Sequence, residues 1–178
     1  ERRGHEVALR RVALLQGVSD NRFVISDDFG RRLMLADATG EVLTMRTLHV
    51  KPADHYQIPF QPRLSADGEL LLPNRKTQQI ERLKVDTLEP AEKPLLSAGT
   101  AMKIPVDAAR GADGRWWVIN TPPCLCSGQI VQFDSQGTRI GRLPITGFND
   151  PRALASIDGK LVVADQDGAR LGVYDIAK

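Results

Sequence analysis

A short Asp-Gly pattern recurs along the chain at a nearly constant interval. Three segments begin with Asp-Gly, continue for five residues and end with Asp or Asn. They start at Asp67, Asp113 and Asp158, and a degenerate copy starts at Asp20, where Asn21 replaces Gly. The intervals between the four starts are 47, 46 and 45 residues. Internal repetition of this kind constrains the fold more than any other feature of the sequence.

Each copy predicts a β-hairpin within a small antiparallel sheet. Asp-Gly between two extended runs favours a tight turn that needs positive φ, which Gly and Asn tolerate. A repeat of roughly 40–50 residues is typical of β-propeller blades. We therefore predict an all-β chain, a β-propeller of four-stranded antiparallel blades in a single domain over residues 1–178. The blades are expected at approximately 13–50, 58–97, 104–144 and 150–178.

The strands of each blade can be placed from the repeat. The strand before the turn, such as 152–156, is expected to be innermost. After the Asp-Gly strand comes another that ends in Asp, expected at 32–37, 80–86, 129–134 and 170–175. Outer strands are expected at 41–48, 93–96 and 138–143.

The last copy carries a family resemblance. Residues 148–175 read FNDPRALASIDGKLVVADQDGARLGVYD. This stretch resembles an NHL repeat, with its Pro-led inner strand, Asp-Gly turn, V-A-D strand and R-x-x-V-F/Y-D strand. The copy with Trp116 is a fair match, and the first two are degenerate. The resemblance implies a propeller related in fold to six-bladed lactonase-like propellers, and it implies no particular activity.

The number of blades is left open. The last copy ends without an outer strand, whereas residues 5–12 form a strand-like piece outside the first blade. Pairing the two would hide an open sheet edge and close a four-bladed ring. NHL-type propellers more often have six blades, so the alternative is that these blades are part of a six-bladed ring.

Charge and composition exclude some classes of function. The 24 basic and 22 acidic residues are interspersed and give a net charge of +2, so we expect no nucleic-acid partner. No apolar run is long enough to span a membrane. The chain begins with Glu1, as expected if a targeting segment, a tag or earlier blades have been removed. Localisation stays open, with an extracytoplasmic site (periplasmic or secreted) favoured.

Loops on one face of a propeller usually bind its ligands, and several residues of these loops are candidates for contacts with a protein or small-molecule ligand. The charged ones form either a mixed-charge docking surface or simply solvated loops. The C-x-C pair is either a soft-metal or redox site or a pair of free or disulfide-linked thiols. His55 is either a third ligand of a soft metal or a solvated surface residue, and the Asp54-His55 dipeptide alone is weak evidence for acid–base catalysis. The candidates are Asp28, Arg31, His55, Arg75, Lys76, Cys124, Cys126, Asp167 and Arg170.

The four polar residues that end the Asp-Gly strands are candidate metal ligands. Asp27, Asn74, Asn120 and Asp165 would present a ring of oxygen atoms at the channel mouth. Oxygen ligands suit Ca²⁺ or another divalent cation, the only cofactor indicated. The alternative is structural, because Asp and Asn commonly end strands by bonding nearby backbone groups.

No catalytic motif is recognisable, so whether the protein is an enzyme stays open. The first hypothesis is a non-enzymatic scaffold that binds a ligand or protein on the loop face. The alternative is a divalent-metal-dependent hydrolase or lyase resembling the calcium-dependent lactonases with six-bladed propellers, although the P-N-G segment of that family is absent. A third hypothesis is a redox or soft-metal protein centred on Cys124 and Cys126.

Overall fold

The computed structural model describes residues 9, 12–18, 20–27, 32–48, 62–65, 68–74, 77–91, 96, 103–122, 128–143 and 147–176. These residues form four antiparallel sheets, which confirms the all-β prediction. No helix occurs in the described part of the chain, and so none there could cross a membrane.

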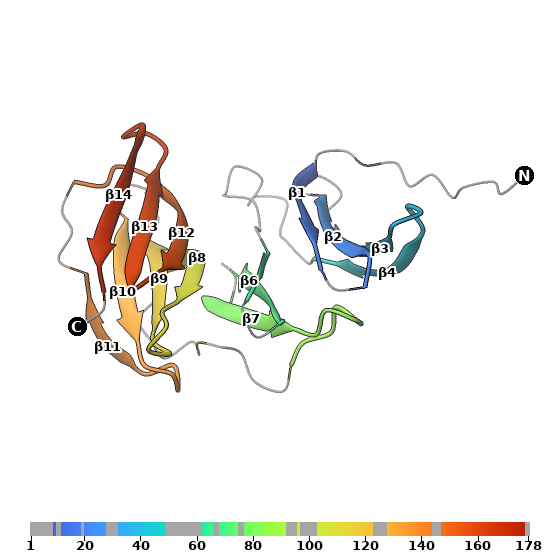
Figure 1. The fold of residues 1–178 in the computed structure, drawn as a ribbon, viewed down its shortest axis with the longest axis horizontal. Helices are drawn as coiled ribbons and strands as arrows, with labels where there is room; N and C mark the ends of the chain where they lie inside the picture. Colours follow the sequence, from blue (N-terminus) through green and yellow to red (C-terminus); the bar gives the residue numbers. More distant parts are fainter. Residues whose placement is uncertain are drawn as a thin grey trace, which may run out of the picture. The chain divides into compact units, whose positions relative to one another are not determined.

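Each sheet follows the chain order of its strands (Figure 1). The first contains β1 (Val12–Gly17), β2 (Arg22–Asp27), β3 (Arg32–Asp37) and β4 (Val42–Thr47). The second contains β5 (Arg63–Leu64), β6 (Leu70–Asn74) and β7 (Gln79–Leu83). The third contains β8 (Ile104–Arg110), β9 (Trp116–Thr121), β10 (Gln129–Phe133) and β11 (Arg139–Arg142). The fourth contains β12 (Pro151–Ile157), β13 (Lys160–Asp165) and β14 (Arg170–Asp175).

The turns that join the two inner strands have the predicted backbone conformation. Gly68, Gly114 and Gly159 have φ of 76°, 81° and 71°, and Asn21 has φ of 56°. Asn21 therefore adopts the left-handed conformation that Gly adopts in the other copies, which explains why Asn is tolerated there. The tightest of these turns has only two residues between the register partners Ile157 and Lys160.

The described strands agree with most of the predicted ones, with three differences. Val12 belongs to β1 of the first sheet, and residues 5–8, 10 and 11 lie outside the described residues. In the region of the second blade's outer strand, Leu96 forms a bridge with Ile80, while 93–95 lie outside the described residues. The strand predicted at 80–86 is β7, which ends at Leu83. The fourth sheet has three strands among the described residues, as predicted from the missing outer strand of the last copy.

The chain divides into two compact units, one of residues 1–72 with 82–92 and one of 73–81 with 93–178. In the first unit, a buried apolar cluster joins the first sheet to part of the second. It consists of Val24, Leu33, Leu35, Leu48, Leu70, Leu72, Leu83 and Leu88. Burying one such Leu side chain stabilises the fold by roughly 1.5–3 kcal/mol, so this cluster contributes substantially to the stability of the unit.

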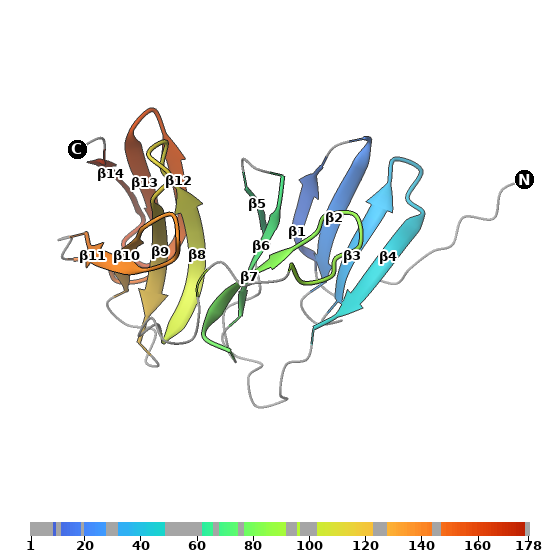
Figure 2. The same ribbon diagram turned by 90° about the horizontal axis from the view of Figure 1, so that it is seen from below.

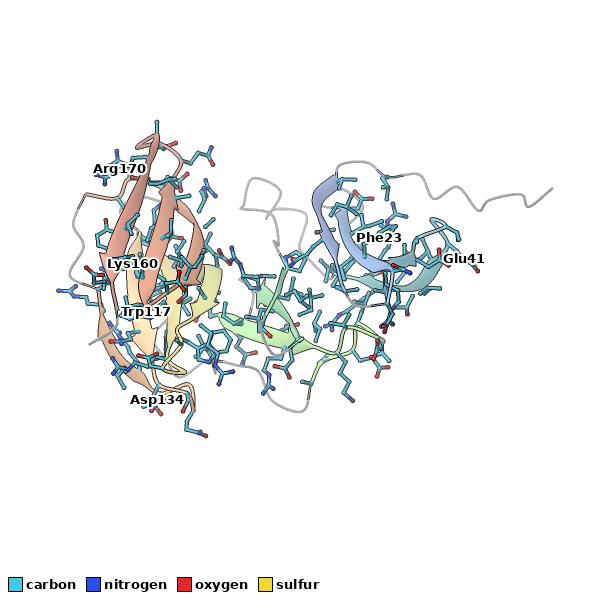
Figure 3. The ribbon with its side chains drawn as sticks, viewed as in Figure 1. Phe23, Glu41, Trp117, Asp134, Lys160 and Arg170 are labelled. Atoms are coloured by element: carbon cyan, nitrogen blue, oxygen red, sulfur yellow. The ribbon has the colours of Figure 1, made fainter. Side chains whose placement is uncertain are left out.

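In the second unit, the sheet β12–β14 lies against the sheet β8–β11 (Figures 1 and 2). The carboxylate of Asp107 on β8 accepts a hydrogen bond from the backbone N–H of Leu154 on β12, at 2.7 Å. Trp117, labelled in Figure 3, is 4% exposed. Leu161 and Val163 of β13 are fully buried. The two sheets therefore share a continuous core.

Candidate functional site

Asp165, the last residue of β13, bonds to the connector residues Asn149 and Asp150, which precede β12. Its side chain is fully buried, and its two oxygens accept backbone N–H groups from Asn149 at 3.2 Å and Asp150 at 2.8 Å. Burial would raise the pKa of Asp165, but the hydrogen bonds from Asp150, Asn149, Arg170 and Gly168 outweigh burial and lower this pKa below its ordinary value. Asp165 therefore stays ionised and holds the start of β12 in place.

Asn120, the residue before the last in β9, holds the start of β8 in the same way. Its Oδ1 accepts the backbone N–H groups of Lys103 at 2.8 Å and Ile104 at 3.2 Å. These two residues precede Pro105, just as Asn149 and Asp150 precede Pro151. In both sheets, a polar side chain near the end of one strand (β9 or β13) thus bonds to the two residues before the proline of the preceding strand (β8 or β12).

The other two polar strand ends bond within their own hairpins. Asp27 is fully buried and pairs with Arg32 at 2.6 Å. Asn74 accepts the N–H of Thr77 at 3.1 Å and donates to the Glu81 carboxylate.

The residue that begins the next strand varies together with the polar strand end. Asp27 and Asp165 are register partners of Arg32 and Arg170. Asn120 is the register partner of Gln129. Where the polar residue is Asp, its register partner is therefore Arg, and where it is Asn, its register partner is Gln. This is the pattern expected of side chains that stabilise the hairpin.

The metal-ligand prediction for Asp27, Asn74, Asn120 and Asp165 is not tested by these contacts. Within the described ranges, no three His, Cys, Asp or Glu side chains come together in a group that could hold a metal ion. The hydrogen bonds described above use at least one side-chain oxygen of each of the four residues. The cation ring stays a prediction, and the function proposed below is not routed through it.

Of the predicted ligand-binding residues, Asp167 and Arg170 are described. Asp167 is exposed in the turn between β13 and β14. Arg170 is 47% exposed and contacts Asp165, and its Nη2 donates to the carbonyl of Gly147. Its guanidinium also lies 5.1 Å from the ring centroid of Phe148. Asp28, Arg31, His55, Arg75, Lys76, Cys124 and Cys126 lie outside the described residues.

A β-bulge recurs where the inner strand begins. The register shifts directly after Val12 in β1, Pro105 in β8 and Pro151 in β12. The register partners of these three residues are the polar residues Asp27, Asn120 and Asp165. The extra residue is Val106 in β8 and Arg152 in β12. Bulges re-aim a side chain and are frequent next to binding sites. Arg152 therefore occupies a repeat position at which Val106 is buried.

Arg152 and Asp150 form the candidate site. Arg152 Nε donates to Asp150 Oδ2 at 2.7 Å, and the Asp150 side chain is only 6% exposed. The other Asp150 oxygen is buried and accepts no hydrogen bond from a described residue. The Arg152 side chain is 28% exposed, and Asp150 is its one partner among the described residues. The guanidinium is thus oriented through Nε, which leaves its two Nη groups for a carbonyl, carboxylate or phosphate oxygen.

The sequence reasoning missed Arg152 and Asp150. A signal was present in the sequence, because aligning Pro105 with Pro151 places Arg152 at the repeat position of Val106. A cation at a repeat position that is otherwise apolar breaks the local pattern, and such departures are expected at functional sites.

No family model matches the chain, and no curated protein matches its sequence. Solved structures match its fold. A streptogramin B lyase matches 92% of this chain with 14% identity and a TM-score of 0.60. The fold is that of a β-propeller. A gluconolactonase from Xanthomonas campestris matches 85% of this propeller with 19% identity and a TM-score of 0.59. The computationally designed Ika4 protein matches 99% with 16% identity and a TM-score of 0.60.

The matched propellers differ in length. This propeller spans 54% of the lyase chain and 53% of the gluconolactonase chain, but 96% of the designed protein. At 14–19% identity, the likeness establishes the β-propeller architecture alone. The assignment of the repeats to the NHL type stays a prediction.

Proposed function

We propose that this propeller binds and turns over a small molecule with a carbonyl or carboxylate oxygen, as a hydrolase or lyase. The observation that carries the proposal is the orientation of Arg152 by the buried carboxylate of Asp150 at the bulge of β12. Two of the matched propellers are a gluconolactonase and a streptogramin B lyase, and the lactone in the name of the first supports a cyclic ester as substrate class.

The chemistry of ester opening suits an oriented guanidinium. In hydrolysis, water adds to the carbonyl carbon and the carbonyl electron pair moves onto its oxygen. Collapse of that intermediate then breaks the ring C–O bond, and the departing oxygen takes a proton. A lyase instead removes a proton beside an activating carbonyl, which places negative charge on the oxygen of that carbonyl; the electron pair then forms a C=C bond as the alkyl C–O bond of the ester breaks and the carboxylate leaves. In each reaction one carbonyl oxygen gains negative charge. Donors aimed at that oxygen stabilise both transition states, and losing one such donor costs about 10²–10³-fold in kcat.

Asp150 would act as a positioning residue. A buried carboxylate bonded to Nε fixes the guanidinium plane and keeps the local charge balanced. Met at position 152 would keep much of the side-chain volume but remove the donors. Arg152→Met therefore tests the proposal, and Arg142→Met, at an exposed arginine on β11, is the matched control.

The experiment measures acid release from glucono-1,5-lactone by the wild type, R152M and R142M, with Ca²⁺ added and after chelation. We expect turnover by the wild type, a loss of about 100-fold or more in R152M and little change in R142M. Equal rates in R152M and the wild type would remove Arg152 from the site. If the wild type neither hydrolyses the lactone nor opens a streptogramin B ester above the blank rate, the enzymatic proposal is wrong and the scaffold hypothesis is favoured.

A further inference from the structure

The chain contains four Asp-Gly dipeptides, which begin at Asp67, Asp113, Asp158 and Asp167. Asp-Gly is the dipeptide at which an aspartate isomerises most readily, because Gly has no side chain to obstruct an attack by its own backbone nitrogen. The attack proceeds best when that nitrogen makes no hydrogen bond, since its N–H proton has to leave. The hydrogen bonds of each turn therefore decide which of the four dipeptides reacts in the folded protein.

In two of the dipeptides the glycine N–H is bonded to a backbone carbonyl of the same turn. The N–H of Gly68 donates to the carbonyl of Ser65 at 3.0 Å. The N–H of Gly114 donates in the same way to the carbonyl of Gly111, also at 3.0 Å. The nitrogen that would attack is thus held in both turns.

In a third dipeptide the glycine N–H is bonded to a side chain. The N–H of Gly168 donates to the buried carboxylate of Asp165. A Cβ at Gly168 would lie 2.3 Å from Oδ2 of Asp165, so this glycine packs directly against the carboxylate. Asp167 is exposed, but the nitrogen that follows it is held.

The turn of Asp158 and Gly159 has no such contact. Gly159 accepts the N–H of Ile176 at its carbonyl, at 2.8 Å, but its own N–H donates to no described residue. The Asp158 side chain is exposed and has no partner in the described part of the chain, whereas the Asp113 carboxylate pairs with Arg115 at 3.1 Å. Both reacting groups are therefore free at this turn.

We infer that Asp158 is a site of spontaneous isomerisation to isoaspartate in the folded protein. The Gly159 nitrogen attacks Cγ of the Asp158 carboxyl group, and the N–H proton leaves with the carboxyl hydroxyl as water, which closes a succinimide ring. Water then adds to one of the two ring carbonyl carbons. Breaking the bond from nitrogen to Cγ restores aspartate, whereas breaking the bond from nitrogen to the former backbone carbon leaves the chain running through Cβ. This site does not include Arg152, so the inference is independent of the proposed function.

The isomer does not fit this turn. Only two residues, with φ of 48° and 71°, separate the register partners Ile157 and Lys160. Isoaspartate adds the Cβ methylene to the main chain and turns the former backbone carbonyl into a free carboxylate. A hairpin connection of two residues depends on a specific backbone geometry, which the longer connection cannot adopt. We therefore expect the isomerised protein to melt at a lower temperature than the unmodified protein.

The experiment follows isoaspartate at each dipeptide separately. Wild-type protein is kept at neutral pH for several weeks, one portion folded and one unfolded in urea, and is then digested with trypsin. Cleavage after Lys and Arg places the four dipeptides in different peptides, which are 64–75, 111–115, 153–160 and 161–170. An isoaspartyl methyltransferase labels the new carboxylate, and fragmentation in a mass spectrometer identifies its position.

In the folded protein we expect isoaspartate to accumulate severalfold faster in peptide 153–160 than in each of the other three. In urea the four rates should approach one another, because the hydrogen bonds of the turns are lost. Peptide 161–170 is the matched control, since Asp167 is also exposed and followed by Gly. The inference is overturned if any other peptide of the folded protein reacts as fast as 153–160.

A pair of variants tests the same ring closure with a different leaving group. Asp158→Asn keeps a residue that tolerates positive φ, and the succinimide then forms with loss of ammonia in place of water. Asp113→Asn is its control, because the N–H of Gly114 is bonded. We expect the folded D158N to lose ammonia severalfold faster than the folded D113N. Equal rates would show that the hydrogen bond of the glycine does not select the site, and the inference would be wrong.

Discussion

The carboxylate of Asp107 accepts the backbone N–H of Leu154 at 2.7 Å and so joins the innermost strands of two successive sheets. Asp107 is 3% exposed, and its other oxygen accepts the N–H of Ala108 at 2.9 Å. Removing a buried acceptor leaves its donors without a partner. We expect Asp107→Ala to lower the free energy of unfolding by about 1–3 kcal/mol in urea denaturation.

Asp167→Ala is the control for this substitution, because Asp167 is an exposed carboxylate in a turn of the same unit. Its effect should stay within about 0.5 kcal/mol. Equal unfolding free energies for the two variants would show that the bond between Asp107 and Leu154 contributes nothing measurable.

The pairing of Asp165 with Arg170 predicts a coupled effect on stability. Asp165→Asn leaves Arg170 without its carboxylate, and Arg170→Gln leaves the buried Asp165 without its cation. The double variant places Asn and Gln at the positions that the register partners Asn120 and Gln129 occupy in the preceding sheet. We expect the double variant to be more stable than the sum of the single effects indicates, by about 0.5–1 kcal/mol, a modest coupling because Arg170 is half exposed. Strict additivity in urea denaturation would contradict the matched-pair interpretation.

The lowered pKa of Asp165 predicts a loss of stability in acid. A carboxyl whose pKa is lower in the folded than in the unfolded chain stabilises the fold fully above the unfolded value, here about 3.8. That contribution is lost as the pH falls from there through the lower folded pKa. Melting curves of the wild type and D165N should therefore approach each other as the pH falls below 4. A constant separation across that range would show that Asp165 does not titrate in this way.

The repeat was readable from the sequence because its determinants are local. A turn that needs positive φ admits Gly or Asn, and residues such as Asn21 and Gly114 adopt it in the structure. The strand boundaries followed from the same pattern, since β3 begins at Arg32 and β14 at Arg170 as expected. Local conformational preference and a fixed period were enough to predict the sheets.

The candidate site was not readable in this way because it depends on pairing between strands. The bulge that presents Arg152 exists only when β12 pairs with β13, and no local propensity indicates it. Likewise, the carboxylate of Asp150 becomes buried through the connector that Asp165 holds. Arg170, predicted from its loop position as a ligand contact, bonds to Gly147 across the sheet edge, and its role in binding stays a prediction.

Gly128 predicts how tightly the start of β12 is held. A Cβ at Gly128 would lie 2.3 Å from Cγ and 2.7 Å from Cδ of Pro151, whose ring cannot rotate away. We expect Gly128→Ala to lower the free energy of unfolding by about 1–3 kcal/mol through overpacking. Gly17→Ala is the control, because a Cβ there meets nothing within 4 Å.

Adding Pro151→Ala to G128A should recover part of that loss by removing the ring, which distinguishes overpacking from a backbone effect of Gly128 itself. Pro151 lies between Asp150 and Arg152, so G128A should also weaken the proposed ligand binding at Arg152 more than its loss of stability explains. If G128A has the same melting temperature as G17A and the wild type, the contact between Gly128 and Pro151 is looser than the geometry indicates, and the start of β12 is free to move.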